Sequence, residues 1–206
     1  MNKLAIIFAG QGSQYTNMGL DFVEKHLSLQ EMEKTASSIL GFDTKEVLAS
    51  DDGRLNETIY TQPLTLLASI YAFETLKEMD LNISAFAGFS LGEYSALYAS
   101  GIFSFEQILR IIKVRSNLMH ECALENPGKM AAILGLKDNE VINVCNNLKE
   151  KGVIEAVNFN SPGQVVVAGE KKLVDSSLDI FKAAGAKRAI ILPVSVPSHC
   201  SLMKEA

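Results

Sequence analysis

The length, composition and charge of this chain exclude several classes of protein. It has 206 residues, of which 48% are hydrophobic and 21% charged, the balance of a globular protein with a substantial core. The formal net charge is -5, and the sequence has no stripe of lysines and arginines with interleaved aromatics, so we expect no nucleic-acid partner. No apolar stretch is long enough to span a bilayer, so we expect no membrane partner.

The cysteine and histidine content predicts neither a disulfide framework nor a metal site. Cys122, Cys145 and Cys200 are odd in number and widely spaced, which favours a reducing compartment. With only three histidines and no Cys-x-x-Cys pair, we expect no metal and no cofactor. The first ten residues resemble a signal peptide superficially, but their apolar run is short and lacks a cleavage pattern. We therefore expect a buried first strand and a cytoplasmic protein.

The first elements are predicted from hydrophobic patterning and turn residues. Leu4 to Ala9 is a continuous apolar run, typical of a strand covered on both faces. It leads into the loop Gly10 to Gln14, where a dinucleotide-binding motif is disfavoured because Tyr15 replaces its third glycine. The elements predicted next are a helix over 22–40, a short helix and loop over 43–56, and a helix near Pro63 running to about Met79 with Thr61 as its cap.

The segment Gly88 to Gly92 has the pattern G-x-S-x-G, which is typical of a nucleophilic serine. A predicted strand over 83–87 precedes it and a predicted helix begins at Leu91, so Ser90 would lie on a sharp turn between them. The glycines allow a tight turn, and the backbone N–H of Leu91 would face negative charge forming on a reacting carbonyl. The alternative is a chance match in a turn rich in glycine and serine.

A charged side chain interrupts the apolar stripe of the next predicted helix. That helix covers 105–124 and follows Gly101, a predicted helix stop. Arg115 falls on its inward face, where a permanent charge is costly unless it meets an anion. Arg115 therefore either extends its head to solvent, pairs with a buried carboxylate, or binds the anionic group of a substrate. The apolar stripe consists of Ile108, Ile111, Ile112, Leu118, Met119 and Cys122.

The second half of the chain has a strand and helix pattern of its own. The order β-α-β-β-α-β is typical of a ferredoxin-like unit, which we place at 129–192. The fold class predicted is therefore α/β, with a main domain of 1–128 and 193–206 into which this subdomain is inserted. The elements predicted are strands over 130–136, 155–159, 164–168 and 187–192, and helices over 138–149, capped by Asp138, and 171–184.

His199 is the best candidate for the base that activates Ser90. His26 lies among charged residues of the first helix, and His120 lies one position off the apolar stripe. His199 instead follows a strand and a proline-rich turn, where α/β enzymes present catalytic side chains, and it comes after Ser90 as in serine hydrolases. Only Glu205 follows it among the acidic residues, so the sequence does not identify a carboxylate that orients it.

The chain resembles the malonyl-CoA:acyl carrier protein transacylases of bacterial fatty acid synthesis over its whole length. The matching segments are 7–14 (IFAGQGSQ), 88–97 (GFSLGEYSAL), Arg115, 158–164 (NFNSPGQ) and 193–203 (PVSVPSHCSLM). The resemblance implies a hydrolase-like parallel-sheet core with an inserted ferredoxin-like subdomain. It also implies malonyl-CoA and acyl carrier protein as partners. We expect a monomer without a cofactor, although the sequence does not fix the oligomeric state.

The resemblance also implies a role for each matching residue. Ser90 would form the malonyl ester, and His199 would act as general base and then as general acid. Backbone N–H groups of Gln11 and Leu91 would form the oxyanion hole, and Arg115 would bind the malonyl carboxylate as a bidentate pair. Asn160 and Met119 would line the substrate pocket.

Two features depart from the family pattern. Many members have His where this chain has Phe89, which cannot accept a proton. Family members also continue well beyond position 206, and that part supplies the carbonyl that orients the catalytic histidine, together with a pocket glutamine. The alternatives are a serine esterase or thioesterase, an acyltransferase of a polyketide pathway, and a non-catalytic interaction module.

Overall fold

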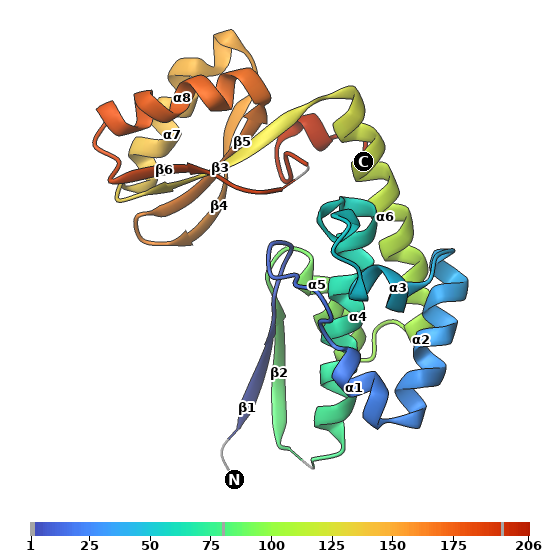
Figure 1. Cartoon of the computed structure of the whole chain (residues 1–206). Helices are drawn as coiled ribbons and strands as arrows, with labels where there is room; N and C mark the ends of the chain where they lie inside the picture. The colour runs from blue at the N-terminus through green and yellow to red at the C-terminus, as the bar shows by residue number, and fades with distance from the viewer. Residues whose placement is uncertain (1–2, 80, 195) are drawn as a thin grey trace. The chain divides into compact units, whose positions relative to one another are not determined.

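The computed structural model describes residues 3–79, 81–194 and 196–206. Met1 and Asn2, in the segment compared with a signal peptide, and Ser195, within the 193–203 match, lie outside these ranges. The chain is an α/β protein, as predicted, and divides into two compact units, Met1–Asn117 and Leu118–Ala206 (Figure 1). This division falls at 117/118 and groups 196–206 with the second unit, whereas the predicted domains divide at 128/129 and group 193–206 with the first.

The first unit is built on two parallel strands, β1 (Leu4–Phe8) and β2 (Ile83–Gly88), which confirms both predicted strands. Their register pairs Leu4 with Ile83 and Phe8 with Gly88. Because the strands are parallel, the loops that follow them leave from the same edge of the sheet. The strands and these two loops lie side by side in Figure 1.

Only one face of this sheet is covered within the described residues. Phe8 is buried, and its ring packs edge-on against Phe73 with the centroids 6.2 Å apart. Ile7 points to the opposite face and is 76% exposed. The prediction that the first strand is covered on both faces is therefore wrong here, because the helices packed on the sheet lie on the Phe8 face (Figure 1).

The first helical region is two helices rather than one. The chain breaks at His26, whose φ of -125° and ψ of 115° are extended, and the His26 carbonyl accepts the first hydrogen bonds of the next helix. The prediction of one helix over 22–40 is therefore wrong at this residue. The helices and turns of this region are α1 (Leu20–Lys25), α2 (Leu27–Leu40), α3 (Thr44–Ala49) and a 3₁₀ turn η1 (Arg54–Asn56), of which the last two match the predicted short helix and loop.

The central helix α4 (Thr58–Lys77) begins earlier than the sequence suggests. Pro63 lies in its second turn, and Thr61 is not its cap. The Thr61 hydroxyl, fully buried, donates to the carbonyls of Leu55 and Glu57 at 2.7 and 2.9 Å. It therefore ties the helix to the preceding turn, which no sequence pattern reveals. The core of the unit forms around α4, α5 (Gly92–Ala99) and α6 (Phe105–Glu125), with Leu64, Leu66, Leu67, Ile70, Tyr71, Leu91, Ile108, Leu109 and Ile112 fully buried.

The second unit is a four-stranded antiparallel sheet in the order β4-β5-β3-β6. Two helices cover one face, where Ile133, Val165, Val174 and Phe181 are fully buried (Figure 1). The predicted β-α-β-β-α-β order is confirmed. Its elements are β3 (Gly128–Leu134), α7 (Asp138–Leu148) with the 3₁₀ turn η2 (Lys149–Lys151), β4 (Ile154–Ser161), β5 (Gln164–Glu170), α8 (Lys171–Ala183) and β6 (Arg188–Ile191).

One predicted cap in this unit is wrong. Asp138 is the first residue of α7, and Lys137 is the flanking residue. The side chain of Glu140 reaches back and accepts from the Lys137 backbone N–H at 2.9 Å. A carboxylate in the first turn satisfies one of the unpaired N–H groups of the helix start, and here that carboxylate belongs to Glu140.

The opposite face of the antiparallel sheet is covered by the last residues of the chain. Cys200 is buried in one cluster with Met130, Val166 and Ala168, and the 3₁₀ turn η3 (Ser201–Met203) follows it. Side chains alternate along β4, so that Ile154 faces the helices while Glu155 stands opposite Ala168 on the face that holds this segment. The residues around His199 therefore rest on a rigid sheet.

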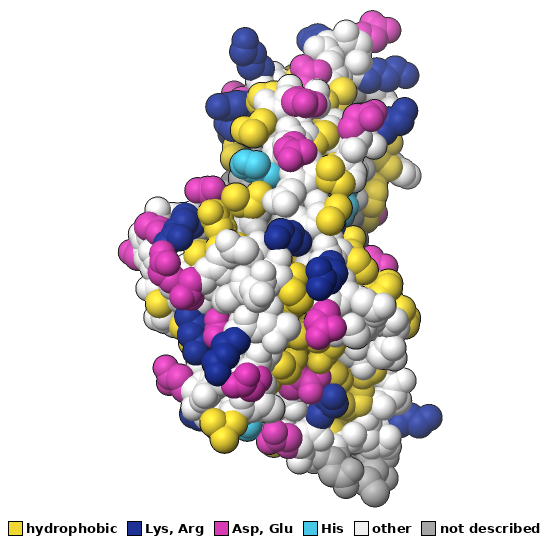
Figure 2. Space-filling model, turned by 90° about the vertical axis from the view of Figure 1, so that its right-hand side faces the viewer, with side chains coloured by type: hydrophobic (Ala, Val, Ile, Leu, Met, Phe, Trp, Pro, Cys, Tyr) yellow, Lys and Arg dark blue, Asp and Glu magenta, His cyan; other side chains and the backbone are white. Residues whose placement is uncertain are grey.

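Acidic and basic side chains are interspersed on the face drawn in Figure 2. Among the helices of the described ranges, none has the length and apolar character needed to cross a bilayer. The described residues also contain no group of three or more His, Cys, Asp or Glu side chains placed to hold a metal ion.

Candidate active site

Ser90 lies on a sharp turn between the end of β2 and the start of α5. Its φ is 51°, in the left-handed region that non-glycine residues rarely adopt, and its side chain is half-buried. The turn is closed by Gly92 N–H donating to the Phe89 carbonyl at 2.9 Å and by Glu93 N–H donating to the Ser90 carbonyl at 3.1 Å. This strand, turn and helix arrangement is the context predicted for a nucleophilic serine.

The glycines around Ser90 are required by close packing of the backbone. A Cβ on Gly92 would overlap the carbonyl oxygen of Phe8, and a Cβ on Gly88 would overlap the backbone of Gly92. A Cβ on Gly10, in the loop after β1, would lie 2.7 Å from the Phe89 carbonyl oxygen. The G-x-S-x-G pattern therefore allows β1, β2 and α5 to meet at Ser90 without steric overlap.

The loop after β1 brings Gln11 to the same edge of the sheet as Ser90. Phe89 N–H donates to the Phe8 carbonyl at 3.0 Å, so the two loops leave the sheet side by side. Inside the first loop, the Ser13 hydroxyl donates to the Gly10 carbonyl at 2.8 Å. Leu91 immediately precedes α5, with its side chain buried in the core. Gln11 thus lies in the loop beside the serine turn, and Leu91 lies within that turn.

Arg115 is held by an amide and an aromatic ring. Its Nη1 donates to Oε1 of Gln62, and its Cζ lies 5.3 Å from the centroid of the Tyr94 ring. Gln62 is fully buried, and its Nε2 donates to the Thr58 hydroxyl at 2.7 Å, which fixes the orientation of the amide. In the described ranges no ion pair involves Arg115. Neutral neighbours thus position the guanidinium without compensating its charge.

His199, in the second unit, also lies on a turn with left-handed backbone geometry. Its φ is 68° and its side chain is exposed. The Ser198 N–H donates to the Val196 carbonyl at 3.0 Å, and the Cys200 thiol donates to the Pro197 carbonyl at 3.1 Å. Beyond the turn, the Cys122 thiol of α6 donates to the Leu202 carbonyl at 3.0 Å. Hydrogen bonds on both sides therefore fix the backbone that carries His199.

Sequence reasoning missed Glu155, which contacts the residue two positions after His199. Its Oε2 accepts from the Ser201 N–H at 3.0 Å, and its Oε1 accepts from the Ser201 hydroxyl at 2.5 Å. Glu155 lies on β4, and 46 residues separate it from Ser201. No motif links the two positions, so a single sequence offers no signal for this pair.

The cysteine next to His199 is a structural residue. Burial raises the pKa of the Cys200 thiol, and burial likewise raises the pKa of Cys145 to about 11. A thiol with a raised pKa carries little thiolate near neutral pH and is a poor nucleophile. Cys200 is therefore not a candidate nucleophile. The described cysteines are all free and buried, in keeping with the expected absence of a disulfide framework.

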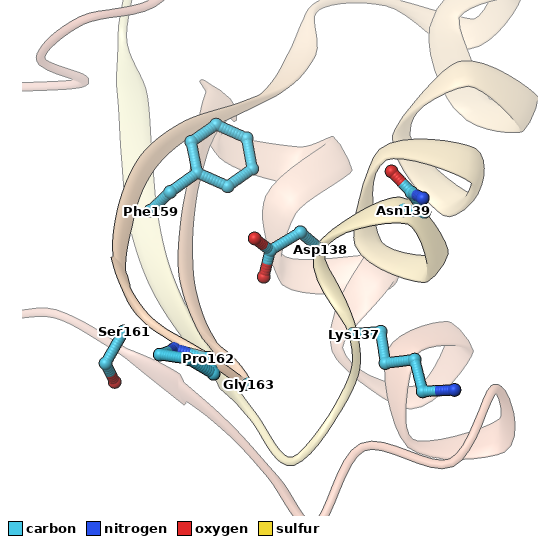
Figure 3. A pocket seen from close by; sticks show the side chains of 7 residues that line it. All are labelled: Lys137, Asp138, Asn139, Phe159, Ser161, Pro162 and Gly163. Carbon is cyan, nitrogen blue, oxygen red and sulfur yellow. The ribbon is translucent and has the colours of Figure 1, made fainter.

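The two further pocket candidates lie in the second unit. Met119 is buried on α6, while Asn160 is exposed near the end of β4. A cavity of about 480 Å³ opens beside the β4–β5 hairpin, and Figure 3 shows Asp138 pointing toward this hairpin and Lys137 pointing away. Asn160 is not one of its lining residues, which are Lys137, Asp138, Asn139, Phe159, Ser161, Pro162 and Gly163. This cavity therefore gives no support to Asn160 as a pocket residue.

Comparisons with known proteins identify the family of the chain. Residues 5–206 match the family described as the acyl transferase domain. The chain is 44% identical to the malonyl CoA-acyl carrier protein transacylase of Haemophilus influenzae and 43% identical to that of Escherichia coli K12, covering 100% of this chain and 67% of each relative. A malonyl-transacylase solved in complex with a type II PKS acyl-carrier protein superposes with a TM-score of 0.92 at 41% identity, covering 99% of this chain and 67% of that one.

These matches define the class of protein to which the chain corresponds, an acyltransferase. The chain belongs to the acyl transferase domain family and, within it, to the malonyl CoA-acyl carrier protein transacylases. It spans about two thirds of the length of the relatives that it matches.

Proposed function

We propose that this chain transfers a malonyl group from malonyl-CoA to the phosphopantetheine thiol of an acyl carrier protein in fatty acid biosynthesis. The observation that carries the proposal is the Ser90 turn, which combines left-handed backbone geometry with glycines that cannot be replaced without overlap. The names of relatives at 43% and 44% identity support malonyl as the acyl group and acyl carrier protein as the acceptor.

Ser90 and His199 carry the chemistry in this proposal. His199 accepts the proton of the Ser90 hydroxyl while the serine oxygen attacks the thioester carbonyl. The new C–O bond forms, the C–S bond breaks, and the departing CoA thiolate takes the proton from His199. The thiol of the carrier then attacks the malonyl ester in the reverse sequence, which returns the proton to Ser90. Backbone N–H groups of Leu91 and Gln11 stabilise the oxyanion of both tetrahedral intermediates.

Arg115 supplies the specificity for malonyl. Its guanidinium is oriented by Gln62 and by the Tyr94 ring, and both are neutral. A carboxylate that meets such a group gains charge-assisted, bidentate hydrogen bonds. We propose that the free carboxylate of the malonyl group is this anion. Met119 and Asn160 are proposed to line the acyl pocket on the family resemblance alone.

The remaining expectations form part of the same proposal. We propose that the second unit is a ferredoxin-like subdomain at 129–192, which its strand order β4-β5-β3-β6 supports, inserted into a hydrolase-like core of 1–128 and 193–206. We further propose a cytoplasmic monomer that binds neither nucleic acid nor membranes and uses no metal or cofactor.

Mass spectrometry of the intact protein tests the proposed function directly. After incubation with malonyl-CoA, we expect one malonyl adduct, mapped to Ser90 by peptide analysis and absent in Ser90→Ala. Addition of holo acyl carrier protein should move the adduct to the carrier. A folded protein that never acquires the adduct would refute the proposal, and rapid release of free malonate without a carrier would favour a thioesterase.

A polyketide pathway is a second candidate setting for the same reaction. The observation in its favour is the similarity to a malonyl-transacylase that was solved with a type II PKS acyl-carrier protein. Rates of malonyl transfer to carriers of the two kinds, measured with one preparation of malonylated protein, distinguish the settings. Transfer at least tenfold faster to a polyketide carrier would favour the second candidate.

A further inference from the structure

His199 occupies a backbone conformation that requires support from its surroundings. A non-glycine residue with a φ of 68° persists only where neighbouring contacts fix it. Two of those contacts are thiol hydrogen bonds, made by Cys200 to Pro197 and by Cys122 to Leu202. Thiols are weak donors, so these bonds alone are modest restraints.

A further restraint on this segment comes from Glu155, which lies 46 residues from Ser201 in the sequence. Its carboxylate accepts two hydrogen bonds from Ser201, one from the backbone N–H at 3.0 Å and one from the hydroxyl at 2.5 Å. Hydrogen bonds to an ionised acceptor are roughly twice as strong as those between neutral groups. Glu155 binds both the backbone N–H and the hydroxyl of Ser201. It therefore limits the rotation of the backbone between His199 and Ser201.

Glu155 is itself held on a rigid element. It stands opposite Ala168 in the β4–β5 ladder, on the sheet face where Cys200 is buried with Met130 and Val166. Because this carboxylate stands on a paired strand, it holds the segment that it binds at a fixed place on the sheet. Through Ser201, Glu155 therefore fixes the turn of His199 against the sheet.

We infer that Glu155 is a positioning residue for His199, acting through its two hydrogen bonds to Ser201. This inference rests on the proposed role of His199 as the base for Ser90. Glu155 takes no part in proton transfer. It fixes the backbone of the turn so that the imidazole keeps one orientation between turnovers, and a small displacement of a catalytic group is enough to slow its reaction.

The test compares three variants of the full chain in malonyl transfer from malonyl-CoA. Glu155→Ala removes both hydrogen bonds, and we expect kcat to fall on the order of tenfold while KM for malonyl-CoA changes less than twofold. Glu155→Gln keeps an oxygen for the Ser201 N–H and an amide for the Ser201 hydroxyl, so most of the rate should return. Glu170→Ala is the matched control, because Glu170 accepts from the Val153 N–H at 3.0 Å on the same sheet and should leave kcat unchanged.

Hydrogen exchange supplies a readout that does not depend on activity. In Glu155→Ala the amide of Ser201 should exchange at least tenfold faster than in the parent chain, while amides of β3 keep their protection. Unchanged exchange at Ser201, or a loss of kcat that Glu170→Ala reproduces, would overturn the inference and leave the proposed function intact. If the parent chain itself forms no malonyl adduct on Ser90, the proposed function fails and the inference falls with it.

Discussion

The turn of Ser90 and the turn of His199 both hold a non-glycine residue at positive φ, but different contacts support the two turns. Both residues have positive φ, 51° for Ser90 and 68° for His199, a conformation that costs about 1–2 kcal/mol for an L-residue. At Ser90 the conformation is fixed by main-chain hydrogen bonds and by glycines that let β1 and α5 approach closely. At His199 it is supported by side chains from α6 and β4, whose hydrogen bonds to the segment span 80 and 46 residues of sequence.

This difference separates a site encoded locally from one encoded by the tertiary structure. The glycines of the motif lie within two positions of Ser90, so the sequence alone predicts the turn, although the Phe8 carbonyl that excludes a Cβ on Gly92 comes from β1. The groups that hold the His199 segment are contributed by Cys122 and Glu155, which no local pattern connects to it. Substitutions near Ser90 should therefore act through steric overlap, and substitutions near His199 through lost hydrogen bonds.

Of the substitutions that test this difference, replacing Gly92 should have the largest effect on stability and on Ser90 acylation. Gly92 lies in α5 with helical geometry, so helix propensity alone would make Gly92→Ala stabilising by up to about 1 kcal/mol. The new Cβ would instead overlap the Phe8 carbonyl, and we expect the free energy of unfolding to fall by about 3 kcal/mol or more, with loss of Ser90 acylation. Urea denaturation and adduct mass spectrometry measure both effects.

The matched control for this substitution is Gly101→Ala. Gly101 has a φ of 77° and nothing within 4 Å of an added Cβ, so the change should cost only the left-handed penalty of about 1–2 kcal/mol. Equal losses of stability in the two variants would contradict the view that steric overlap fixes the Ser90 turn.

Replacing Arg115 should change substrate preference while leaving the serine turn intact. In Arg115→Ala the charge-assisted pair with the malonyl carboxylate is lost, which is worth about 1.5–3 kcal/mol, or roughly tenfold to 150-fold in the preference for malonyl-CoA over acetyl-CoA. Competition between the two thioesters for Ser90, followed by mass spectrometry, gives this ratio. Arg110→Ala, an exposed arginine on the same helix, should keep it, and an unchanged ratio in Arg115→Ala would rule out the carboxylate role.

Replacing Cys122 should have a smaller effect on stability, and the loosening should be confined to the segment that follows His199. Cys122→Ala removes the hydrogen bond to the Leu202 carbonyl and should lower the free energy of unfolding by about 1–2 kcal/mol, with faster amide exchange over 200–204. Cys145→Ala, a buried thiol on α7, is the control and should leave that exchange unchanged. If both variants loosen 200–204 equally, the thiol is not a specific restraint on the turn.

The smallest effect expected is a pH dependence from a buried thiol. Burial raises the pKa of Cys145 to about 11, above the usual value of about 8.5 for a free thiol. The protonated thiol thus stabilises the fold fully below pH ~8.5, and this contribution is lost as the pH rises through about 11. The difference in unfolding free energy between the parent chain and Cys145→Ala should therefore narrow from pH 8 to pH 10.5. A constant difference would contradict the raised pKa.

Much of the fold followed from hydrophobic period and turn residues. Both strands of the first unit and the β-α-β-β-α-β order of the second unit are where the patterns predict. The errors fall where a long-range contact overrides a local rule. Thr61 suits a helix cap, yet its hydroxyl bonds the preceding turn, and the apolar first strand was expected to be covered on both faces, whereas Ile7 is exposed.

The sequence by itself predicted the Ser90 turn, because the two glycines beside the serine lie within two positions of it. The steric reason for Gly92 comes from the tertiary structure, since a Cβ there would overlap the Phe8 carbonyl of β1. The sequence also determined that Arg115 interrupts an apolar stripe, since helical periodicity is a local property. Only the tertiary structure decided that Gln62 and Tyr94 hold Arg115, and that Glu155 holds the segment after His199. Hydrogen bonds between distant residues depend on how the strands and helices pack, and that packing leaves no periodic signal in a single sequence.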